Sequence, residues 1–219
     1  RDSLKYQSAY GLDGIRTMYR GTLRRPGFCR AWDVFVKLGA TDDTYPLERV
    51  DQMTHRDFLN TFLAYHASDS VELKLMHYMN ISSDSDLMEK FEWLGLFTDE
   101  LVGLSEGSPA QVLQHILMKK WTMTDADTDM LAMIHRIEYE LAGEQFRIQS
   151  SLVAKGRSAD VTAMSYTVGW PVAMATRLVA LELIPERGVL MPNVASLYEP
   201  ILSELGSRGI RFDERIQRL

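Results

Sequence analysis

The sequence predicts an α+β fold, in which helices cover a mixed β-sheet and an all-helical subdomain is inserted into the chain. Residues 133–141 and 146–154 alternate between apolar and polar side chains, which is typical of two strands joined as a hairpin. Apolar residues recur at steps of three and four over residues 158–183, and this spacing predicts a long helix with one apolar stripe. Residues 41–121 carry repeated helix-start signals and no convincing strand pattern, which indicates the inserted helical part.

The composition is that of an ordinary globular protein and argues against two classes of partner. Of the 219 residues, 46% are hydrophobic and 25% are charged, so the chain is long enough for one large domain with a sizeable insertion. We expect residues 1–40 and 122–219 to form the main α/β domain and residues 41–121 to form the insertion. A net charge of −6 argues against a nucleic-acid surface, whose affinity would rest on phosphate neutralisation. No apolar run is long enough for a membrane-spanning helix, so we expect no membrane partner.

The start of the sequence, its short motifs and its cysteine and histidine residues indicate which cofactors, metals and location to expect. The sequence opens on Arg1 rather than on methionine, so we expect the chain to be a piece of a longer polypeptide. It contains neither GxGxxG nor a P-loop, and we therefore expect no cofactor-binding residue in it. The single cysteine, Cys29, forbids an internal disulfide, which fits a reducing, cytoplasmic location. We expect no metal site, because the following histidines lack ligand spacing: His55, His66, His77 and His115.

Residues 17–27, which read TMYRGTLRRPG, are predicted to form a strand that ends in a tight turn and joins the main sheet. Arg20, Thr22 and Arg24 would share one face of this strand at period two. Two arginines and a hydroxyl group suit an anion site, because a guanidinium group matches a carboxylate with two parallel hydrogen bonds. A strand with one solvated basic face fits the same residues, and both interpretations stay open at this point.

A helix is predicted between Pro26, which suits a first helical turn, and Gly39, which suits a helix end. Cys29 lies among large apolar neighbours in this helix, so we expect a buried and unreactive thiol. The apolar stripe of the helix comprises Phe28, Trp32, Phe35, Val36 and Leu38. Four further helices are predicted to begin near Thr54, Val71, Ser85 and Ser108.

The second half of the chain supplies the remaining strands and helices. His135 lies on the apolar face of the predicted hairpin, and we expect a core histidine rather than a catalytic base. Gly169 and Pro171 interrupt the long helix, where the proline should kink it at a cost of about 3 kcal/mol. The interruption fits either access for a ligand or a neighbouring domain, or close packing of the helix on the sheet. The last predicted elements are a helix and a strand, at residues 197–205 and 210–216.

Four motifs follow one another along nearly the whole chain. They are Arg1-Asp2-Ser3, the run Arg20 to Arg24 followed by Pro26-Gly27, Thr167-Val168-Gly169 with Pro171, and Gly188 to Pro192 followed by Tyr198-Glu199-Pro200. In sequence and order they resemble the glutamate-forming saccharopine dehydrogenases, also called saccharopine reductases. The run RGTLR is the most specific of the four.

The resemblance implies a parent enzyme of lysine metabolism with two parts. A dinucleotide-binding Rossmann half would precede Arg1, and residues 1–219 would be most of the substrate-binding half. Enzymes of this family are oxidoreductases that oxidise the secondary amine of saccharopine with NAD or NADP and release glutamate and 2-aminoadipate 6-semialdehyde. We expect this piece alone to be inactive and to hold no cofactor.

The resemblance also implies a set of substrate-binding residues, because saccharopine carries three carboxylates. Arg1 and Arg24 would act as carboxylate clamps, Thr22 as a hydroxyl donor and Leu23 through its backbone. Arg20 would be a further clamp or an orienting group. The proton-transfer residues of the family lie upstream, so no catalytic residue is assigned to this chain. We expect a homodimer; the alternative is a non-catalytic anion-binding or dimerisation module of the same fold.

Overall fold

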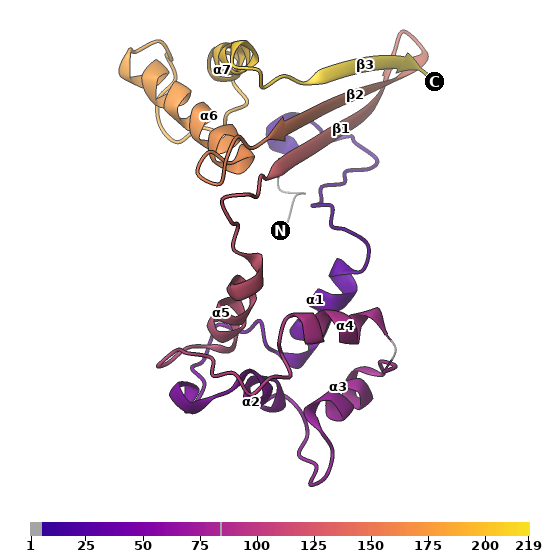
Figure 1. The fold of residues 1–219 in the computed structure, drawn as a ribbon. Coiled ribbons are helices and arrows are strands. Elements are labelled where there is room, and N and C mark those ends of the chain that lie inside the picture. The colour runs from indigo at the N-terminus through magenta and orange to yellow at the C-terminus, as the bar shows by residue number, and fades with distance from the viewer. Residues whose placement is uncertain (1–5, 84) are drawn as a thin grey trace. The chain divides into compact units, whose positions relative to one another are not determined.

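A computed structural model describes residues 6–83 and 85–219 and has the α+β class that the sequence predicts (Figure 1). Its described residues form seven α-helices and one three-stranded sheet. The chain divides into two compact units. Residues 17–122 form the helical unit, and residues 123–219, together with the described residues up to Arg16, form the sheet unit. The predicted division, with residues 41–121 as an insertion, stays a prediction.

The helical unit contains five α-helices and a short 3₁₀ helix. These are α1 (Phe28–Leu38), η3 (Val50–Gln52), α2 (His55–Asn60), α3 (Val71–Met79), α4 (Asp86–Trp93) and α5 (Pro109–Trp121). The helix starts predicted near residues 54, 71, 85 and 108 are confirmed. Thr54 and Ser108 each form a capping box, in which the cap hydroxyl and the third helical side chain bond reciprocally to backbone N–H groups.

One apolar cluster fills the helical unit. Its largest fully buried side chains include Phe58, Phe91 and Ile116, from three different helices. A single antiparallel bridge joins Thr54 to Leu101 at the edge of this cluster. Within the described part of residues 41–121 it is the one β-type pairing, so this region remains helical in character.

The sheet unit is built on β1 (Met130–Leu141), β2 (Glu144–Lys155) and β3 (Asp213–Arg218), in the order β1-β2-β3 with antiparallel neighbours. The predicted hairpin is confirmed, and Ile137 faces Ile148 across it. Ala142 and Gly143 make the connection with φ of 55° and 82°. Positive φ at both central residues is the geometry that a two-residue hairpin turn requires.

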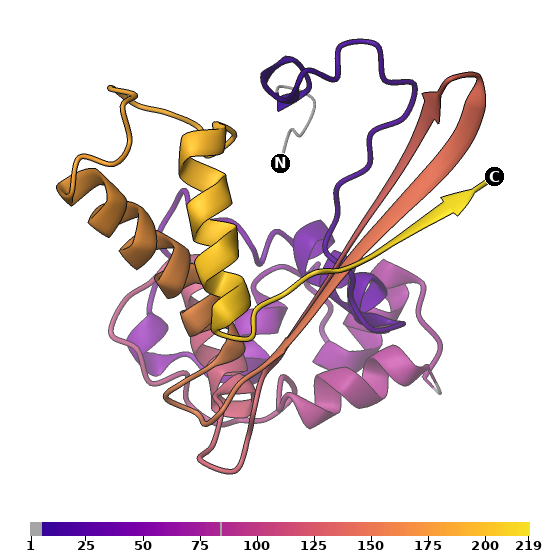
Figure 2. The same cartoon turned by 90° about the horizontal axis from the view of Figure 1, so that it is seen from above.

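Two helices and a 3₁₀ turn complete the sheet unit: α6 (Ala163–Ala180), α7 (Ala195–Ser207) and η2 (Ser8–Tyr10). Figure 2 shows α6 and α7 side by side at one end of the strands. Pro171 lies inside α6, as the sequence predicts. Ala163, Met174 and Leu178 are the buried residues of α6.

The predicted mixed sheet is wrong in two respects. All three strands run antiparallel to their neighbours, and residues 17–24 belong to no strand in the described structure. The segment offers a sheet no apolar face, because arginines and a threonine occupy one side and Gly21 weakens the other. The last strand begins at Asp213 rather than at residue 210, and all of its residues are exposed.

Two predictions of burial are also wrong, and the predicted apolar stripe of α6 is not the buried side of a core helix. Cys29 is exposed, because it follows the first residue of α1 and points away from the buried face formed by Val34, Phe35 and Leu38. His135 is exposed on β1, where its ring contacts Phe212 edge to face at 5.8 Å. The stripe predicted for α6 is largely solvent-exposed, because this helix has apolar residues on several sides and its spacing alone does not decide which side is buried.

Candidate functional site

The predicted substrate residues lie on an extended segment that leads into α1. Residues 17–25, here called the basic arm, have no helix or strand structure. Arg20, Thr22, Leu23 and Arg24 are all exposed on it, and Leu23 is 89% exposed. Pro26 restricts the preceding residue to extended conformations, and Gly27, with φ of 87°, then begins the helix. Arg1 lies outside the described residues.

The side chain of Arg24 is the best defined on the basic arm. Its guanidinium carbon lies 5.4 Å from the centre of the Phe28 ring, and Nη1 donates a hydrogen bond of 3.2 Å to the carbonyl of Leu23. No hydrogen bond or ion pair ties Arg20 or Thr22 to another described residue. Most donors of the arm therefore face solvent and are free for an anionic ligand.

A series of aromatic rings connects Arg24 to the core of the helical unit. The Phe28 ring stacks on Trp32 at 6.0 Å, Trp32 meets Phe35 edge to face at 5.7 Å, and Phe35 meets Phe91 at 5.6 Å. Phe35 and Phe91 are 2% and 1% exposed. We call Phe28, Trp32, Phe35 and Phe91 the aromatic ladder. Phe28, Trp32 and Phe35 belong to the apolar stripe predicted from sequence, whereas the cation contact at their end was not predicted.

The acidic side chains beside the ladder are paired with lysines. Asp86 on α4 accepts a hydrogen bond of 2.7 Å from Lys90, and Asp33 on α1 pairs with Lys37 at 2.6 Å. The hydrogen bond from Lys90 is the main cause that lowers the pKa of Asp86, and the charge of Arg30 adds to it. In the described structure no carboxylate forms an ion pair with Arg24. The arginine therefore keeps its charge available.

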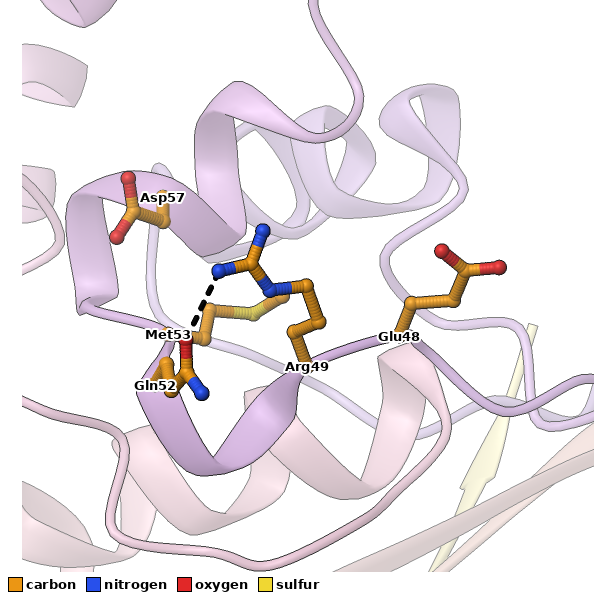
Figure 3. A pocket seen from close by; sticks show the side chains of 5 residues that line it. All are labelled: Glu48, Arg49, Gln52, Met53 and Asp57. Carbon is orange, nitrogen blue, oxygen red and sulfur yellow. Dashed lines mark hydrogen bonds between the residues drawn. The ribbon is translucent and has the colours of Figure 1, made fainter.

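Two shallow pockets lie away from the basic arm. The first, of about 340 Å³, belongs to the helical unit (Figure 3). Its lining residues are Glu48, Arg49, Gln52, Met53 and Asp57. Arg49 has a left-handed backbone, with φ of 57°, and its Nη2 donates to Gln52 at 2.9 Å. The second pocket, of about 470 Å³, lies between α7 and β3 in the sheet unit. Of the predicted substrate residues that the structure describes, none lines either pocket.

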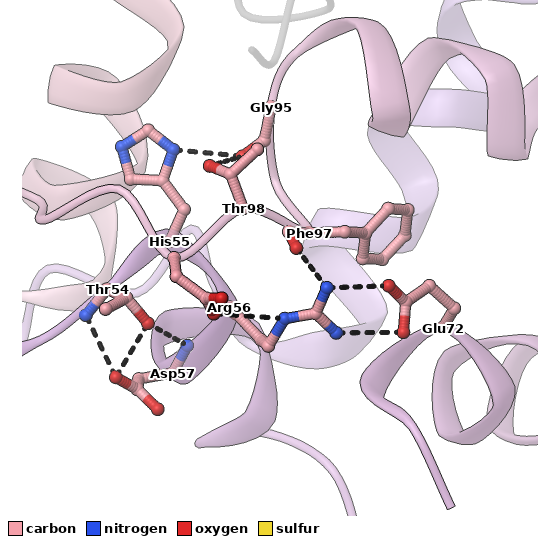
Figure 4. A network of polar contacts seen from close by, with 9 residues as sticks. Thr54, His55, Arg56, Asp57, Glu72, Gly95, Phe97 and Thr98 are labelled. Atoms are coloured by element: carbon pink, nitrogen blue, oxygen red, sulfur yellow. Dashed lines mark hydrogen bonds and ion pairs between the residues drawn. The ribbon is translucent and has the colours of Figure 1, made fainter.

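A polar network connects α2 to the rest of the helical unit (Figure 4). His55 is 1% exposed; its Nδ1 lies 3.0 Å from the carbonyl of Gly95, and its Nε2 lies 3.2 Å from the ammonium group of Lys119. Lys119 also donates to Glu100 at 2.7 Å. An ammonium group only donates, so Nε2 accepts and Nδ1 carries the proton. Burial is the main cause that lowers the pKa of His55.

Arg56 forms the second half of this network. Its guanidinium group binds both carboxylate oxygens of Glu72 on α3, at 3.0 and 2.9 Å, and also donates to the carbonyl of Phe97. Burial raises the pKa of Glu72, but the hydrogen bonds, that of Arg56 foremost, outweigh it and the pKa lies below its usual value. These contacts satisfy the polar groups of the network internally, which is the arrangement of a structural element.

Neither metal ligation nor membrane insertion has support in the described residues. They contain no group of three or more histidine, cysteine, aspartate or glutamate side chains that could hold a metal ion. None of their helices combines the length and the apolar character needed to cross a bilayer.

The comparison with protein families settles which family these features belong to. The family model described as saccharopine dehydrogenase C-terminal domain matches residues 1–210. This chain belongs to that family. The resemblance noted in the four motifs is thereby confirmed, and it covers almost the whole chain.

Relatives within the saccharopine dehydrogenase family agree in both sequence and fold. The chain is 33% identical to the mitochondrial alpha-aminoadipic semialdehyde synthase of Rattus norvegicus, over 97% of this chain and 23% of the rat protein. It is 28% identical to the NADP(+), L-glutamate-forming saccharopine dehydrogenase of Schizosaccharomyces pombe, over 99% of this chain and 50% of that protein. An apo structure of the L-Glu-forming enzyme from Saccharomyces cerevisiae superposes with a TM-score of 0.80 at 27% identity. It matches over 99% of this chain and 50% of the yeast chain.

The coverage has a direct meaning for function. The chain spans about half or less of the length of these relatives, which are oxidoreductases of lysine metabolism. It is thus homologous to one part of a larger enzyme.

Proposed function

We propose that this chain is the substrate-binding, C-terminal domain of a saccharopine dehydrogenase-like oxidoreductase acting on CH–NH groups. The observation that carries the proposal is the basic arm. This chain belongs to the family, and its basic arm carries four of the predicted substrate residues on one exposed segment: Arg20, Thr22, Leu23 and Arg24. A substrate with several carboxylates loses hydration on binding, so each carboxylate needs a fixed counter-charge or donor. In this proposal the arm supplies them.

The roles of the arm residues follow from their chemistry. The planar guanidinium group of Arg24 offers two parallel donors to one carboxylate, and Thr22 offers a hydroxyl group. Leu23 contributes through its backbone N–H, because its carbonyl already accepts from Arg24. Arg20 binds a second carboxylate or orients the first. Arg1 is proposed as a second clamp by its match to the family motif.

In this proposal NAD or NADP would serve as the oxidant of the whole enzyme. The chain has no glycine-rich phosphate loop, so its residues do not fit a dinucleotide and none is assigned to the cofactor. A dinucleotide-binding domain outside residues 1–219 would hold it. No proton-transfer residue is assigned within the chain either, and the isolated chain is proposed to be inactive.

A second function has an observation of its own. Met133, Ile134, Ile137 and Leu141 are all exposed on β1, and so are Val168, Val172 and Val179 on α6. Met133, Ile137 and Leu141 share one face of β1 by the alternation of a strand, and an exposed apolar face is typical of an interaction surface. A dimerisation or anion-binding module without catalysis therefore stays the alternative. We also propose a homodimer and a cytoplasmic location for the enzyme itself, although the rat relative is named as mitochondrial.

Arg24→Lys in the full-length protein that contains this chain tests the proposal. Lysine keeps the charge but loses the planar fork, and hydrogen bonds to charged groups contribute about 1.5–3 kcal/mol. Because 1.4 kcal/mol corresponds to about tenfold, kcat/KM for saccharopine should fall by about one to two orders of magnitude.

The matched control is Arg25→Lys, the neighbouring arginine to which no substrate role is assigned; it should stay within about twofold of wild type. Steady-state kinetics measures both variants. Near wild-type kcat/KM for Arg24→Lys and Arg24→Ala would mean that Arg24 is only a solvated residue, and would favour the non-catalytic module.

A further inference from the structure

We infer that Phe28 is a positioning residue for Arg24, and that it holds the guanidinium group ready for a substrate carboxylate. The inference rests on the proposed function and adds to it a residue outside the predicted set. Phe28 does not touch substrate in this scheme. It acts through Arg24, whose guanidinium carbon lies 5.4 Å from its ring centre.

The geometry leaves the arginine able to bind. An aromatic face attracts a cation through the negative charge density above the ring. An aromatic ring beside the guanidinium carbon takes up no hydrogen bond of the kind that a carboxylate or carbonyl acceptor would, so it leaves N–H donors available for a ligand. The Nη1 bond to the Leu23 carbonyl, at 3.2 Å, restrains the group from a second direction. Two restraints reduce the rotamer freedom that an exposed arginine would otherwise lose on binding a ligand.

The ring that restrains Arg24 is itself fixed. Phe28 stacks on Trp32 with an interplanar angle of 5° and lies 6.4 Å from Trp121 on α5. Trp32 continues the ladder to Phe35, which is buried in the core. The position of the guanidinium group thus depends on contacts that reach the buried part of the helical unit. A solvated arginine on an unstructured segment has no such support.

The surrounding acidic side chains also form no ion pair with Arg24 in the described structure. Asp86 on α4 and Asp33 on α1 are each paired with a lysine on their own helix. An arginine with no local carboxylate in the described structure keeps its bidentate site for a carboxylate of a ligand. An aromatic partner, unlike an acidic one, restrains the arginine without occupying its donors.

The test is a double-mutant cycle in the full-length protein, with kcat/KM for saccharopine as the measured quantity. A cation–π contact at an exposed site corresponds to about two- to fivefold, so Phe28→Leu should lower kcat/KM by that factor, mainly through KM. Phe28→Tyr keeps the aromatic face and should stay within about twofold of wild type. In the Arg24→Ala background, Phe28→Leu should have no further effect, because the restrained group is gone.

A control and a spectroscopic readout separate positioning from general damage. Tyr65→Leu replaces an aromatic side chain that is 89% exposed elsewhere in the helical unit, and it should leave kcat/KM unchanged. The Arg24 Nε–H resonance should shift on Phe28→Leu, because it loses the ring current, and should stay near its wild-type position in Phe28→Tyr.

The outcomes distinguish the inference from the proposed function. If Arg24→Ala lowers kcat/KM and Phe28→Leu does not, Arg24 binds substrate unaided and the inference is wrong while the function stands. If Arg24→Ala has no effect, the substrate role of the arm fails and the inference fails with it. Equal losses from Phe28→Leu with and without Arg24 would assign Phe28 a role in folding alone and also overturn the inference.

Discussion

The helical unit and the sheet unit bury their apolar side chains to different extents. In the helical unit one continuous cluster includes Phe58, Leu59, Phe91 and Ile116, each at most 1% exposed. In the sheet unit the strands bury few side chains, among them Leu152 and Ala154 of β2, and every residue of β3 is exposed. The sheet unit has no lack of regular secondary structure, so the contrast lies in packing.

This contrast separates two sources of stability. A closed apolar cluster stabilises the helical unit from within, because burying apolar area contributes about 25 cal/mol per Å². The sheet unit leaves apolar residues of β1 and α6 in water, and those residues could gain stability only from a further surface. The difference agrees with the proposed homodimer. The predicted substrate residues that the structure describes, Arg20, Thr22, Leu23 and Arg24, belong to the helical unit, whose core is the more closely packed.

The largest effect expected from this contrast is a core truncation. Phe58→Ala removes a ring that is 0% exposed and should lower the free energy of unfolding by about 3–5 kcal/mol. Ile137→Ala on β1, where the side chain is 54% exposed, should cost less than about 1 kcal/mol. Urea denaturation followed by circular dichroism measures both. Equal losses at the two positions would show that the sheet unit packs as tightly as the helical unit.

The parts of the fold that were predictable from sequence are those fixed by near neighbours. Thr54 and Ser108 cap their helices through residues three positions later, so the whole signal lies within four residues. The hairpin follows in the same way from the alternation on both sides of its turn. Its register was not predicted, because the sequence pattern left residues 142–145 as the turn, whereas β2 begins at Glu144 and the turn is Ala142 and Gly143. Interactions between residues this close in sequence can be predicted without knowing how the rest of the chain folds.

The wrong predictions concern contacts that are decided at long range. A strand needs a partner, and residues 17–24 alternate like a strand without any partner in the described sheet. An apolar helix needs a surface to define its buried side, and the composition of α6 leaves that side open. Local patterns state which structures are possible, whereas the available partners select one of them.

The candidate site shows the same difference between short-range and long-range contacts. Arg20, Thr22, Leu23 and Arg24 are contiguous, so their common location on one segment was predictable. The contact of Arg24 with Phe28 spans four residues and could have been proposed from that spacing. The contact of His55 with Lys119 joins residues 64 positions apart, and no local sequence pattern predicts it.

A smaller effect is expected at Gly156 in the sheet unit. A Cβ atom there would lie 2.2 Å from Oδ1 of Asp129. The carboxylate of Asp129 accepts from two amides at the start of α6, that of Ala163 at Oδ1 and that of Met164 at Oδ2. Gly156→Ala should displace this carboxylate and lower the free energy of unfolding by about 1–2 kcal/mol, as the loss of a helix cap does. Gly169→Ala is the control, because no atom lies within 4 Å of a Cβ there and alanine favours a helix. Thermal unfolding compares the two, and an unchanged Gly156→Ala variant would mean that Asp129 does not hold α6.

The smallest expected effect is a pH dependence of the helical unit, which originates at His55. Its pKa lies below the ordinary value of 6.5, chiefly because of burial, and the Lys119 ammonium group and nearby His115 lower it further. The Gly95 carbonyl and the Glu100 carboxylate oppose that shift without reversing it. Below about pH 6.5 the unfolded chain therefore binds a proton at this residue that the folded protein does not.

The sign of the effect follows from that difference in proton binding. The contribution of His55 to the free energy of unfolding should be constant above pH 6.5. It should fall as the pH drops below that value, because the unfolded chain gains a proton there, whereas the folded His55, buried and accepting from Lys119 at Nε2, resists protonation. Losing this hydrogen bond costs about 0.5–1.5 kcal/mol. Urea denaturation at several pH values between 5 and 8 measures the slope, with the exposed His77→Gln variant as the matched control. His55→Gln should flatten the slope while His77→Gln keeps it, and an unchanged slope in His55→Gln would assign the acid sensitivity to other groups.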